Sequence, residues 1–302
     1  MPGAKLGFVG LGTMGAPMVL NLLKKGFDVT VSSGHPNSSG VKLATANGAV
    51  SVEHPVEVAR ASDIVIMCLP KAEVSENVFF GDSGLLAGSR PGTIIVEMST
   101  VPPSTVKKFG SAAKKKRVKV LDAPVSGGRP GAELGTLTIM VGGDEESFQR
   151  CKPIFEAVGK RIYHVGGLGA GETMKLVNGL IGNATLMAAL EALDVASRSG
   201  LDLRFVQGVV SASTGQSWVW DNLVPKILDG KDLGVRLDIL AKDVGYASSM
   251  ADGVGTDAKI TREVSSVIAE LRQEVGMAVD LSSAFASMSR GRKRKAGRAS
   301  HH

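Results

Sequence analysis

The chain has 302 residues, more than one hydrophobic core usually serves, and its 43% hydrophobic residues exclude an intrinsically disordered protein. Its two cysteines exclude a disulfide framework and favour a reducing compartment. Residues 289–302 carry six of the 35 basic residues, which leaves 29 basic against 29 acidic residues and excludes a basic, nucleic-acid-binding body.

The N-terminal segment reads Met1-Pro2-Gly3-Ala4-Lys5 and lacks the long apolar region of a signal peptide. No run of apolar residues is expected to be long enough to span a bilayer. We therefore expect a cytoplasmic protein without a membrane partner.

Apolar runs alternate with helical patterns through the first half of the chain. Residues 5–9 and 28–32 are typical of buried strands, and residues 14–25 between them place apolar side chains at helical spacing. Further runs typical of strands are Ile64–Leu69, Thr93–Met98, Lys119–Leu121 and Leu137–Val141. Strands separated by helices predict an α/β fold with a doubly wound parallel sheet.

The second half changes to helical patterns. Residues 171–199 form one long apolar pattern that ends at Gly200, and we expect this helix to be buried between two domains. Further helices are expected at Arg204–Ser213, Trp218–Leu228, Ile239–Asp252 and Lys259–Val275. The sequence thus predicts a sheet domain at 1–165, an all-α domain at 166–288 and a disordered basic tail at 289–302.

A glycine pattern directly follows the first predicted strand. The segment Gly10-Leu11-Gly12-Thr13-Met14-Gly15 has the spacing G-x-G-x-x-G. The first glycine permits a tight turn, the second lets the backbone approach a pyrophosphate, and the third lets the helix pack on the strand. Because the N-terminus of a helix binds phosphate, the pattern indicates a Rossmann-type site for NAD or NADP.

The end of the second strand bears on the choice of dinucleotide. NAD enzymes commonly carry Asp or Glu there, whereas this chain reads Ser32-Ser33-Gly34-His35. Because this segment has no carboxylate that would repel a 2′-phosphate, we favour NADP(H), with Ser33 and His35 as candidate contacts. The alternative for His35 is an exposed loop residue.

Four further segments lie at strand ends, after a strand or at a helix start. They are Ile66-Met67-Cys68-Leu69-Pro70, Glu97-Met98-Ser99-Thr100-Val101-Pro102-Pro103, Asp122-Ala123-Pro124-Val125-Ser126-Gly127-Gly128 and Gly169-Ala170-Gly171-Glu172-Thr173-Met174-Lys175-Leu176-Val177-Asn178. With Lys242-Asp243 downstream, their order resembles the β-hydroxyacid dehydrogenases. That family includes 3-hydroxyisobutyrate dehydrogenase, tartronate semialdehyde reductase and, more distantly, 6-phosphogluconate dehydrogenase. The stretch from Gly215 to Asp243 looks most like L-threonate dehydrogenases.

The resemblance implies hydride transfer between NAD(P) and a small 3-hydroxyacid or its oxo form. Lys175, expected in the first turn of the long helix, would be the catalytic proton carrier. Burial and the helix N-terminus both disfavour an ammonium ion, which would lower the lysine pKa from its ordinary ~10.4 towards the range of a general base. Outside such a motif, a lysine near a helix start is usually a solvated side chain.

The resemblance also implies the substrate contacts. Ser126, Gly127 and Gly128 would bind the carboxylate, and Asn178, one turn beyond Lys175, would hydrogen-bond the hydroxyl. Part of the family has its Asn one position later, where this chain has Gly179.

The remaining implied contacts belong to the cofactor. Leu69, Pro70 and Thr100 would line the nicotinamide end, Lys242 would reach the cofactor from the second domain, and Asp243 would orient neighbouring polar groups. Adjacent helical residues such as these two do not normally face each other. The histidines have no metal-ligand spacing, so no metal is expected.

Two other functions compete with the dehydrogenase. One is a carbonyl or imine reductase on the same scaffold, although imine reductases typically lack the lysine. The other is a non-catalytic nuclear scaffold that uses the basic tail for nucleic acid. Because the helical domain exposes apolar segments, we expect a homodimer or homotetramer.

Overall fold

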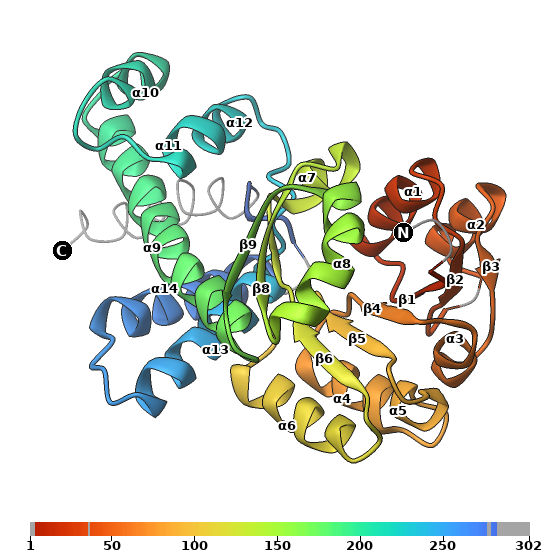
Figure 1. Ribbon diagram of the computed structural model, residues 1–302. Coiled ribbons are helices and arrows are strands. Elements are labelled where there is room, and N and C mark those ends of the chain that lie inside the picture. Colours follow the sequence, from red (N-terminus) through yellow and green to blue (C-terminus); the bar gives the residue numbers. More distant parts are fainter. Residues whose placement is uncertain (1–3, 36, 277–278, 283–302) are drawn as a thin grey trace. The chain divides into compact units, whose positions relative to one another are not determined.

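The computed structural model describes residues 4–35, 37–276 and 279–282 (Figure 1). The chain divides into two compact units, the first reaching to Lys175 and the second beginning at Leu176. This division falls inside helix α9 (Ala170–Arg198), beyond the boundary expected at residue 165. The predicted basic tail, 289–302, lies outside the described residues.

A single sheet of nine strands forms the centre of the first unit, as far as its residues are described. The strands are β1 (Leu6–Val9), β2 (Val29–Ser32), β3 (Val50–Ser51), β4 (Ile64–Met67), β5 (Ile94–Glu97), β6 (Lys119–Asp122), β7 (Val125–Ser126), β8 (Leu137–Gly142) and β9 (Gly159–Gly166). Parallel pairs join β3, β2, β1, β4, β5 and β6 in that order; β8 lies antiparallel to β6, and β7 and β9 pair with β8. The predicted doubly wound sheet is confirmed, and the run Leu137–Val141 forms the predicted strand β8, whose antiparallel direction its apolar pattern did not indicate.

Helices cover both faces of this sheet (Figure 1). On one face α1 (Gly15–Lys24) contacts α2 (Ser39–Ala46), α7 (Gly128–Leu134) and α8 (Glu145–Val158). On the other face lie α3 (Pro55–Ala61), α4 (Ala72–Phe80), α5 (Leu85–Gly88) and α6 (Pro103–Lys114). Every residue of β1, β4 and β5 is buried between these layers, which explains their continuous apolar runs.

The carboxyl ends of the central strands are aligned. Val9 of β1 pairs with Ser32 of β2 and with Met67 of β4. Met67 pairs with Glu97 of β5, and Glu97 pairs with Asp122 of β6. The segments that follow these strands therefore emerge at one edge of the sheet. Because the strand order reverses at β1, this edge includes the topological switch point where α/β sheets bind ligands.

The described elements of the second unit are all helices, as predicted. After α9 come α10 (Leu203–Ser211), α11 (Trp218–Asn222), α12 (Val224–Leu228), α13 (Leu237–Gly253) and α14 (Lys259–Val275). The single helix expected at Trp218–Leu228 is two helices, because Pro225 starts a new first turn at α12. Leu190, Leu240 and Ile268 belong to the core of this unit.

Helix α9, which we expected to be buried between two domains, has one buried face and one exposed face. Leu190 and Leu193 are fully buried, whereas Ile181 and Val195 are 68% and 59% exposed. The helix also has the length and composition of a membrane-crossing helix, with a mean hydropathy of 1.4 in its most apolar window. This corrects the expectation that no such run exists, although the core helices of soluble proteins meet the same criteria.

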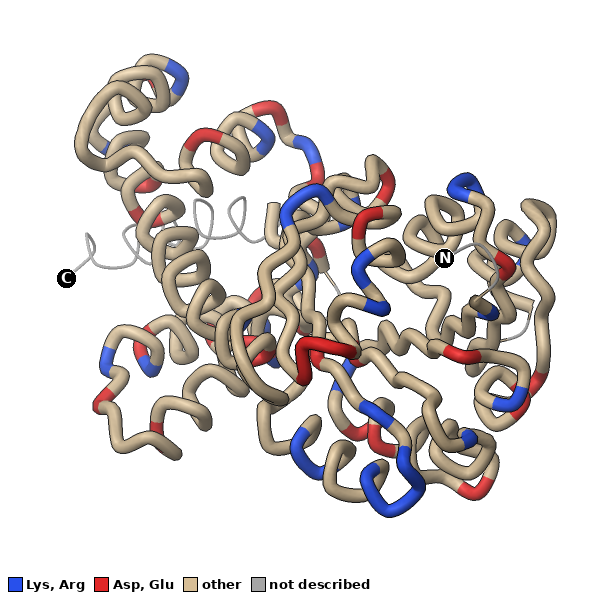
Figure 2. Tube along the Cα trace, in the orientation of Figure 1, with Lys and Arg blue, Asp and Glu red and all other residues tan. Residues whose placement is uncertain are grey.

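Charged residues of both signs are interspersed along the helices and loops of both units (Figure 2). The basic run Lys114–Arg117 begins at the last residue of α6, where positive charge suits the helix dipole. Lys116 in this run donates a hydrogen bond to the carbonyl oxygen of Leu86 at 3.0 Å.

Candidate active site

The glycine loop joins β1 to α1. Gly10 has a φ of +100°, and a Cβ on it would lie 2.3 Å from the carbonyl oxygen of Cys68. A Cβ on Gly15 would lie 1.9 Å from the carbonyl oxygen of Gly10, so both positions require glycine. A Cβ on Gly12 would meet nothing within 4 Å, which leaves open space where a pyrophosphate has to approach the backbone.

The start of α1 fits a phosphate group. Met14 is its N-cap and supplies no side-chain hydrogen bond, and no acidic residue lies in the first turn. No side chain of the cap therefore competes with an anion for the first N–H groups. Thr13 is exposed beside Gly12, and Leu11 is buried, with its carbonyl oxygen against Gly40 of α2.

The expected ribose end lies after β2. Ser32 is buried and its hydroxyl donates to the carbonyl oxygen of Glu53 at 3.0 Å. Ser33 is half-buried, and its hydroxyl oxygen accepts the N–H of His35 at 3.5 Å. His35 itself is exposed. Ser33 and His35 thus lie close together, at the strand end where a ribose is bound in such folds.

The segments after β4 and β5 are joined by a hydrogen-bond chain. The Leu69 N–H donates to the hydroxyl of Ser99 at 2.7 Å, and the Ser99 N–H donates to Oε1 of Glu97 at 2.9 Å. The Ser99 hydroxyl donates to the same oxygen. Leu69 also packs on the glycine loop, since a Cβ on Gly10 would lie 2.9 Å from its side chain. Pro70 is exposed, and Thr100 is half-buried.

Asp122, at the end of β6, holds the start of α9. Its Oδ1 accepts the Gly169 N–H at 2.7 Å, and its Oδ2 accepts the Glu172 N–H at 2.8 Å. Burial raises the pKa of Asp122, and these N–H donors oppose the effect. Gly171 lies so close that a Cβ would be 2.3 Å from the carbonyl oxygen of Met140. This packing fixes the first turn of α9 on the sheet edge.

Glu172 is a site residue that the sequence interpretation missed. It is fully buried, and its Oε2 accepts the Val101 N–H at 3.2 Å, which ties α9 to the segment after β5. Burial raises the pKa of Glu172 well above its usual range, and the charges of Glu97 and Asp122 raise it further. Glu97 was also missed, although a carboxylate that ends the apolar run Ile94–Glu97 is a sign of a buried acid.

Lys175 is half-buried in α9, three residues beyond Glu172. As the sixth residue of the helix it lies in the second turn, not the first as expected, so the helix N-terminus affects its charge less than the sequence implied. Asn178 follows one turn later on the same helix face and is exposed.

The predicted substrate loop follows β6. Ser126 is half-buried in β7, where it pairs with Thr138 of β8. Gly127 and Gly128 are exposed and have φ values of +128° and +59°, which glycine adopts without strain. Gly128 begins α7, so the loop presents backbone at a helix start beside the sheet edge.

Lys242 and Asp243 lie on α13 in the second unit. The Lys242 Nζ is 3.1 Å from Oδ1 of Asp243, although adjacent helical residues were not expected to face each other. The same Nζ lies 5.4 Å from the centre of the Tyr246 ring. Both charged side chains are mostly buried, which is unusual for a solvated surface pair.

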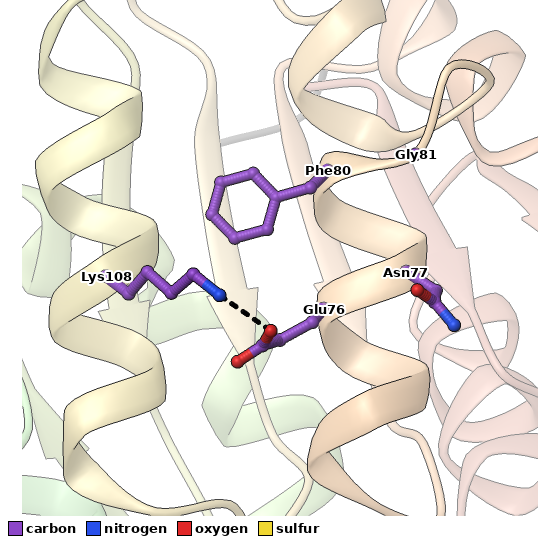
Figure 3. Close-up of a pocket in the computed structure, with 5 residues that line it drawn as sticks. All are labelled: Glu76, Asn77, Phe80, Gly81 and Lys108. Atoms are coloured by element: carbon purple, nitrogen blue, oxygen red, sulfur yellow. Dashed lines mark hydrogen bonds and ion pairs between the residues drawn. The ribbon is translucent and has the colours of Figure 1, made fainter.

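A separate hollow of about 420 Å³ lies on α4 and α6 (Figure 3). Lys108 and Glu76 form an ion pair of 2.7 Å across it, and the Lys108 Nζ lies 5.2 Å from the centre of the Phe80 ring. Gly81, at the end of α4 away from the carboxyl end of β4, also lines it. None of the predicted site residues lines this hollow. Among the described residues, no cluster of His, Cys, Asp or Glu could hold a metal ion.

Comparison with known proteins agrees with this geometry. Residues 5–166 match the model of the NAD binding domain of 6-phosphogluconate dehydrogenase, and residues 169–288 match that of NADP-dependent 3-hydroxyisobutyrate dehydrogenase. The 2-(hydroxymethyl)glutarate dehydrogenase of Eubacterium barkeri is 41% identical over 245 residues, 80% of this chain and 81% of that protein. The structure of Mycobacterium tuberculosis 3-hydroxyisobutyrate dehydrogenase with L-serine aligns with a TM-score of 0.86 and 28% identity, covering 94% of this chain and 99% of that one. An imine reductase from Pseudomonas sp. aligns at 0.62 and 18% identity, covering 94% and 99%, which shows the fold alone.

The glycine loop at the switch point of a doubly wound sheet defines a dinucleotide-binding oxidoreductase. The extent of the matches then identifies the family: the chain belongs to the β-hydroxyacid dehydrogenases. It is an NAD(P)-dependent hydroxyacid dehydrogenase, as the resemblance of its motifs implied.

Proposed function

We propose that this enzyme interconverts a small 3-hydroxyacid and its oxo form with NADP(H), and that Lys175 carries the hydroxyl proton. The observation that supports this most strongly is the anchoring of α9. Asp122 and Glu172 attach its first turn to the ends of β6 and β5, so Lys175 is positioned from the edge that bears the glycine loop. Substrates of the 3-hydroxyisobutyrate type and sugar acids such as threonate fit the proposal.

In the proposed oxidation, the substrate gives a hydride to one acceptor and a proton to another. The bound nicotinamide supplies the hydride acceptor. The Lys175 amine takes the proton from the substrate hydroxyl as the C–H hydride leaves, and it returns the proton to the carbonyl oxygen in the reduction. This step requires a base whose pKa lies near neutral pH, because such a base can both accept and release the proton.

The other proposed contacts orient the substrate and cofactor. Ser126 and the N–H groups of Gly127 and Gly128 would bind the carboxylate, and Asn178 would donate to the hydroxyl oxygen. Lys242 would contact the cofactor, with Asp243 holding its side chain through their 3.1 Å ion pair. Gly10 to Gly15, with Leu69, Pro70 and Thr100, would hold the dinucleotide from the pyrophosphate to the nicotinamide.

A lysine substitution tests this assignment. We expect Lys175→Ala to lower kcat on the order of 10²–10⁴-fold, because a positioned proton carrier contributes that much. The Kd for NADPH, measured by fluorescence titration, should stay near the wild-type value. Lys152→Ala, at an exposed lysine of α8, is the matched control. Wild-type activity in the Lys175 variant would rule out the proposed role.

A panel of acids and both dinucleotides tests the substrate and cofactor. Threonate, glycerate and 3-hydroxyisobutyrate are compared with NADP and NAD, together with a cyclic imine and NADPH for the imine reductase alternative. We expect turnover of an acid and faster rates with NADP(H). Ser33→Asp should reverse the cofactor preference, because a carboxylate repels the 2′-phosphate and accepts from a free ribose hydroxyl. An NAD preference in the wild type would contradict the cofactor proposal.

The same proposal includes the organisation of the molecule. We infer a domain boundary near residues 165 and 166, which the matches to residues 5–166 and 169–288 support. We also propose a cytoplasmic homodimer or homotetramer. Its support is the exposure of large apolar side chains near the junction of α9, α10 and α11, among them Phe205 and Trp218.

A further inference from the structure

Three buried carboxyl groups lie where the ends of two strands meet the first turn of α9. Glu97 ends β5, Asp122 ends β6, and Glu172 belongs to α9. Each residue is 0% exposed, and Glu97 and Asp122 are paired neighbours in the sheet. Three negative charges in such a space would repel one another strongly in a low dielectric. We therefore expect at least one of the carboxyl groups to stay protonated.

The hydrogen-bond donors distinguish the three groups. Both oxygens of Asp122 accept backbone N–H groups from α9 or the turn before it. Oε1 of Glu97 accepts both the N–H and the hydroxyl of Ser99. Glu172 accepts the Val101 N–H at Oε2, and its buried Oε1 has no hydrogen-bond partner among the described residues. Donors stabilise a carboxylate, so Glu172 is the least favoured of the three to ionise.

We propose that Glu172 is a neutral carboxylic acid at neutral pH and a positioning residue, which fastens the segment after β5 to α9 without placing a negative charge beside Lys175. This inference rests on the proposed function of Lys175. The pKa of Glu172 agrees with it: burial raises that pKa most, Glu97 and Asp122 raise it further, and Lys175 and the Val101 N–H only partly oppose them.

The charge of Glu172 matters because of its spacing from Lys175. Residues three apart on a helix are neighbours, and the two groups interact electrostatically. An ionised Glu172 would stabilise the ammonium form of Lys175 and weaken it as a base. A neutral Glu172 keeps its hydrogen bond to Val101 and leaves the amine able to release its proton at lower pH. The groups that act on Glu172 are Glu97 from β5, Asp122 from β6 and Lys175 from α9 itself.

Infrared spectroscopy tests the protonation of Glu172 without reference to activity. A protonated carboxyl group has a carbonyl stretch separate from that of a carboxylate. We expect this band in the full-length wild-type protein at neutral pH, and its loss in Glu172→Gln. Glu156→Gln, at an exposed glutamate of α8, should leave the band unchanged. If Glu172→Gln removes no such band from the wild-type spectrum, the proposal is wrong.

The pH dependence of kcat/KM tests the effect on the proton carrier. Glu172→Gln copies a neutral acid, so its pH profile should stay within about 0.3 unit of the wild type. If Glu172 were ionised, the same variant would shift the profile down by about one unit or more and contradict the proposal.

The two proposals can fail separately. The infrared band should persist in Lys175→Ala if the protein itself holds the proton on Glu172. If Lys175→Ala keeps full activity and the band is present, the proposed role of Lys175 is wrong and the proposed protonation of Glu172 is supported. If Lys175→Ala loses activity and the wild type lacks the band, the role of Lys175 is supported and the protonation of Glu172 is wrong.

Discussion

Gly171 packs so closely on the sheet edge that one methyl group would displace main chain. A Cβ there would lie 2.3 Å from the carbonyl oxygen of Met140 and 2.8 Å from that of Asp122. Neither atom belongs to a flexible side chain, so the first turn of α9 would have to move and carry Lys175 with it. We expect Gly171→Ala to lower the free energy of unfolding by about 1–3 kcal/mol, measured by urea denaturation, and to reduce kcat.

A glycine in the same helix provides the control. A Cβ on Gly182 would meet nothing within 4 Å. Alanine is favoured over glycine in a helix, so Gly182→Ala should raise the free energy of unfolding by about 0.5–1 kcal/mol. Equal destabilisation by both substitutions would show that close packing at Gly171 is not the cause.

At this scale the sequence predicted residues whose motif is local. The glycines of the 10–15 loop have roles that follow from their spacing, and Gly10 and Gly15 have the close contacts that those roles require. Glu172 was missed because its burial depends on a contact with Val101 in the segment after β5, 71 residues away in the chain. No local pattern reveals that the Val101 N–H meets Glu172.

At the scale of elements, α8 illustrates how one side chain starts a helix. Asp144 is its N-cap and accepts the Ser147 N–H at 3.0 Å. Partial burial raises the pKa of Asp144, but the Ser147 donors and the charge of Lys119 outweigh it, so the pKa lies below the ordinary 3.8. We expect Asp144→Ala to lower the free energy of unfolding by about 1 kcal/mol at pH 7.

The pH dependence of that loss has a definite sign. A carboxyl group with a depressed pKa in the folded state stabilises the protein above the pKa of the unfolded chain. The contribution declines below pH 3.8 and is lost as the pH falls through the folded-state value. Denaturant titrations of wild type and Asp144→Ala at several pH values check this, and Asp144→Ser, which keeps a cap, should lose less. A difference that grew towards low pH would contradict the assignment.

The elements that the sequence predicted share strong patterns. The apolar runs at 64–69 and 93–98 became β4 and β5, which are buried on both faces. β9, which pairs with β8, was missed because Lys160, Arg161 and His164 interrupt its sequence, so Gly159–Gly166 contains no apolar run. The direction of β8 was not predictable either, because chain order alone does not tell whether a strand pairs parallel or antiparallel.

At the scale of the whole molecule, the second unit exposes several large apolar side chains. Helix α10 buries none of its residues, and Phe205, one turn before Val209 on the same face, is 71% exposed. Trp218 of α11 is 64% exposed, while its neighbour Trp220 is buried and donates to the carbonyl oxygen of Gln207. Soluble monomers rarely expose several large apolar side chains together, so a second copy of the chain is the proposed occupant.

Substituting the most exposed of these side chains tests that proposal. A charge buried at an apolar interface costs several kcal/mol, so Phe205→Glu should dissociate the oligomer. Light scattering coupled to gel filtration should then give the mass of one chain, against a multiple of it for the wild type. Val50→Glu, at an exposed apolar residue of β3 in the first unit, should leave the oligomer intact. A wild-type chain that elutes as a monomer at micromolar concentration, or a Phe205→Glu variant of unchanged mass, would exclude this face as the contact between copies.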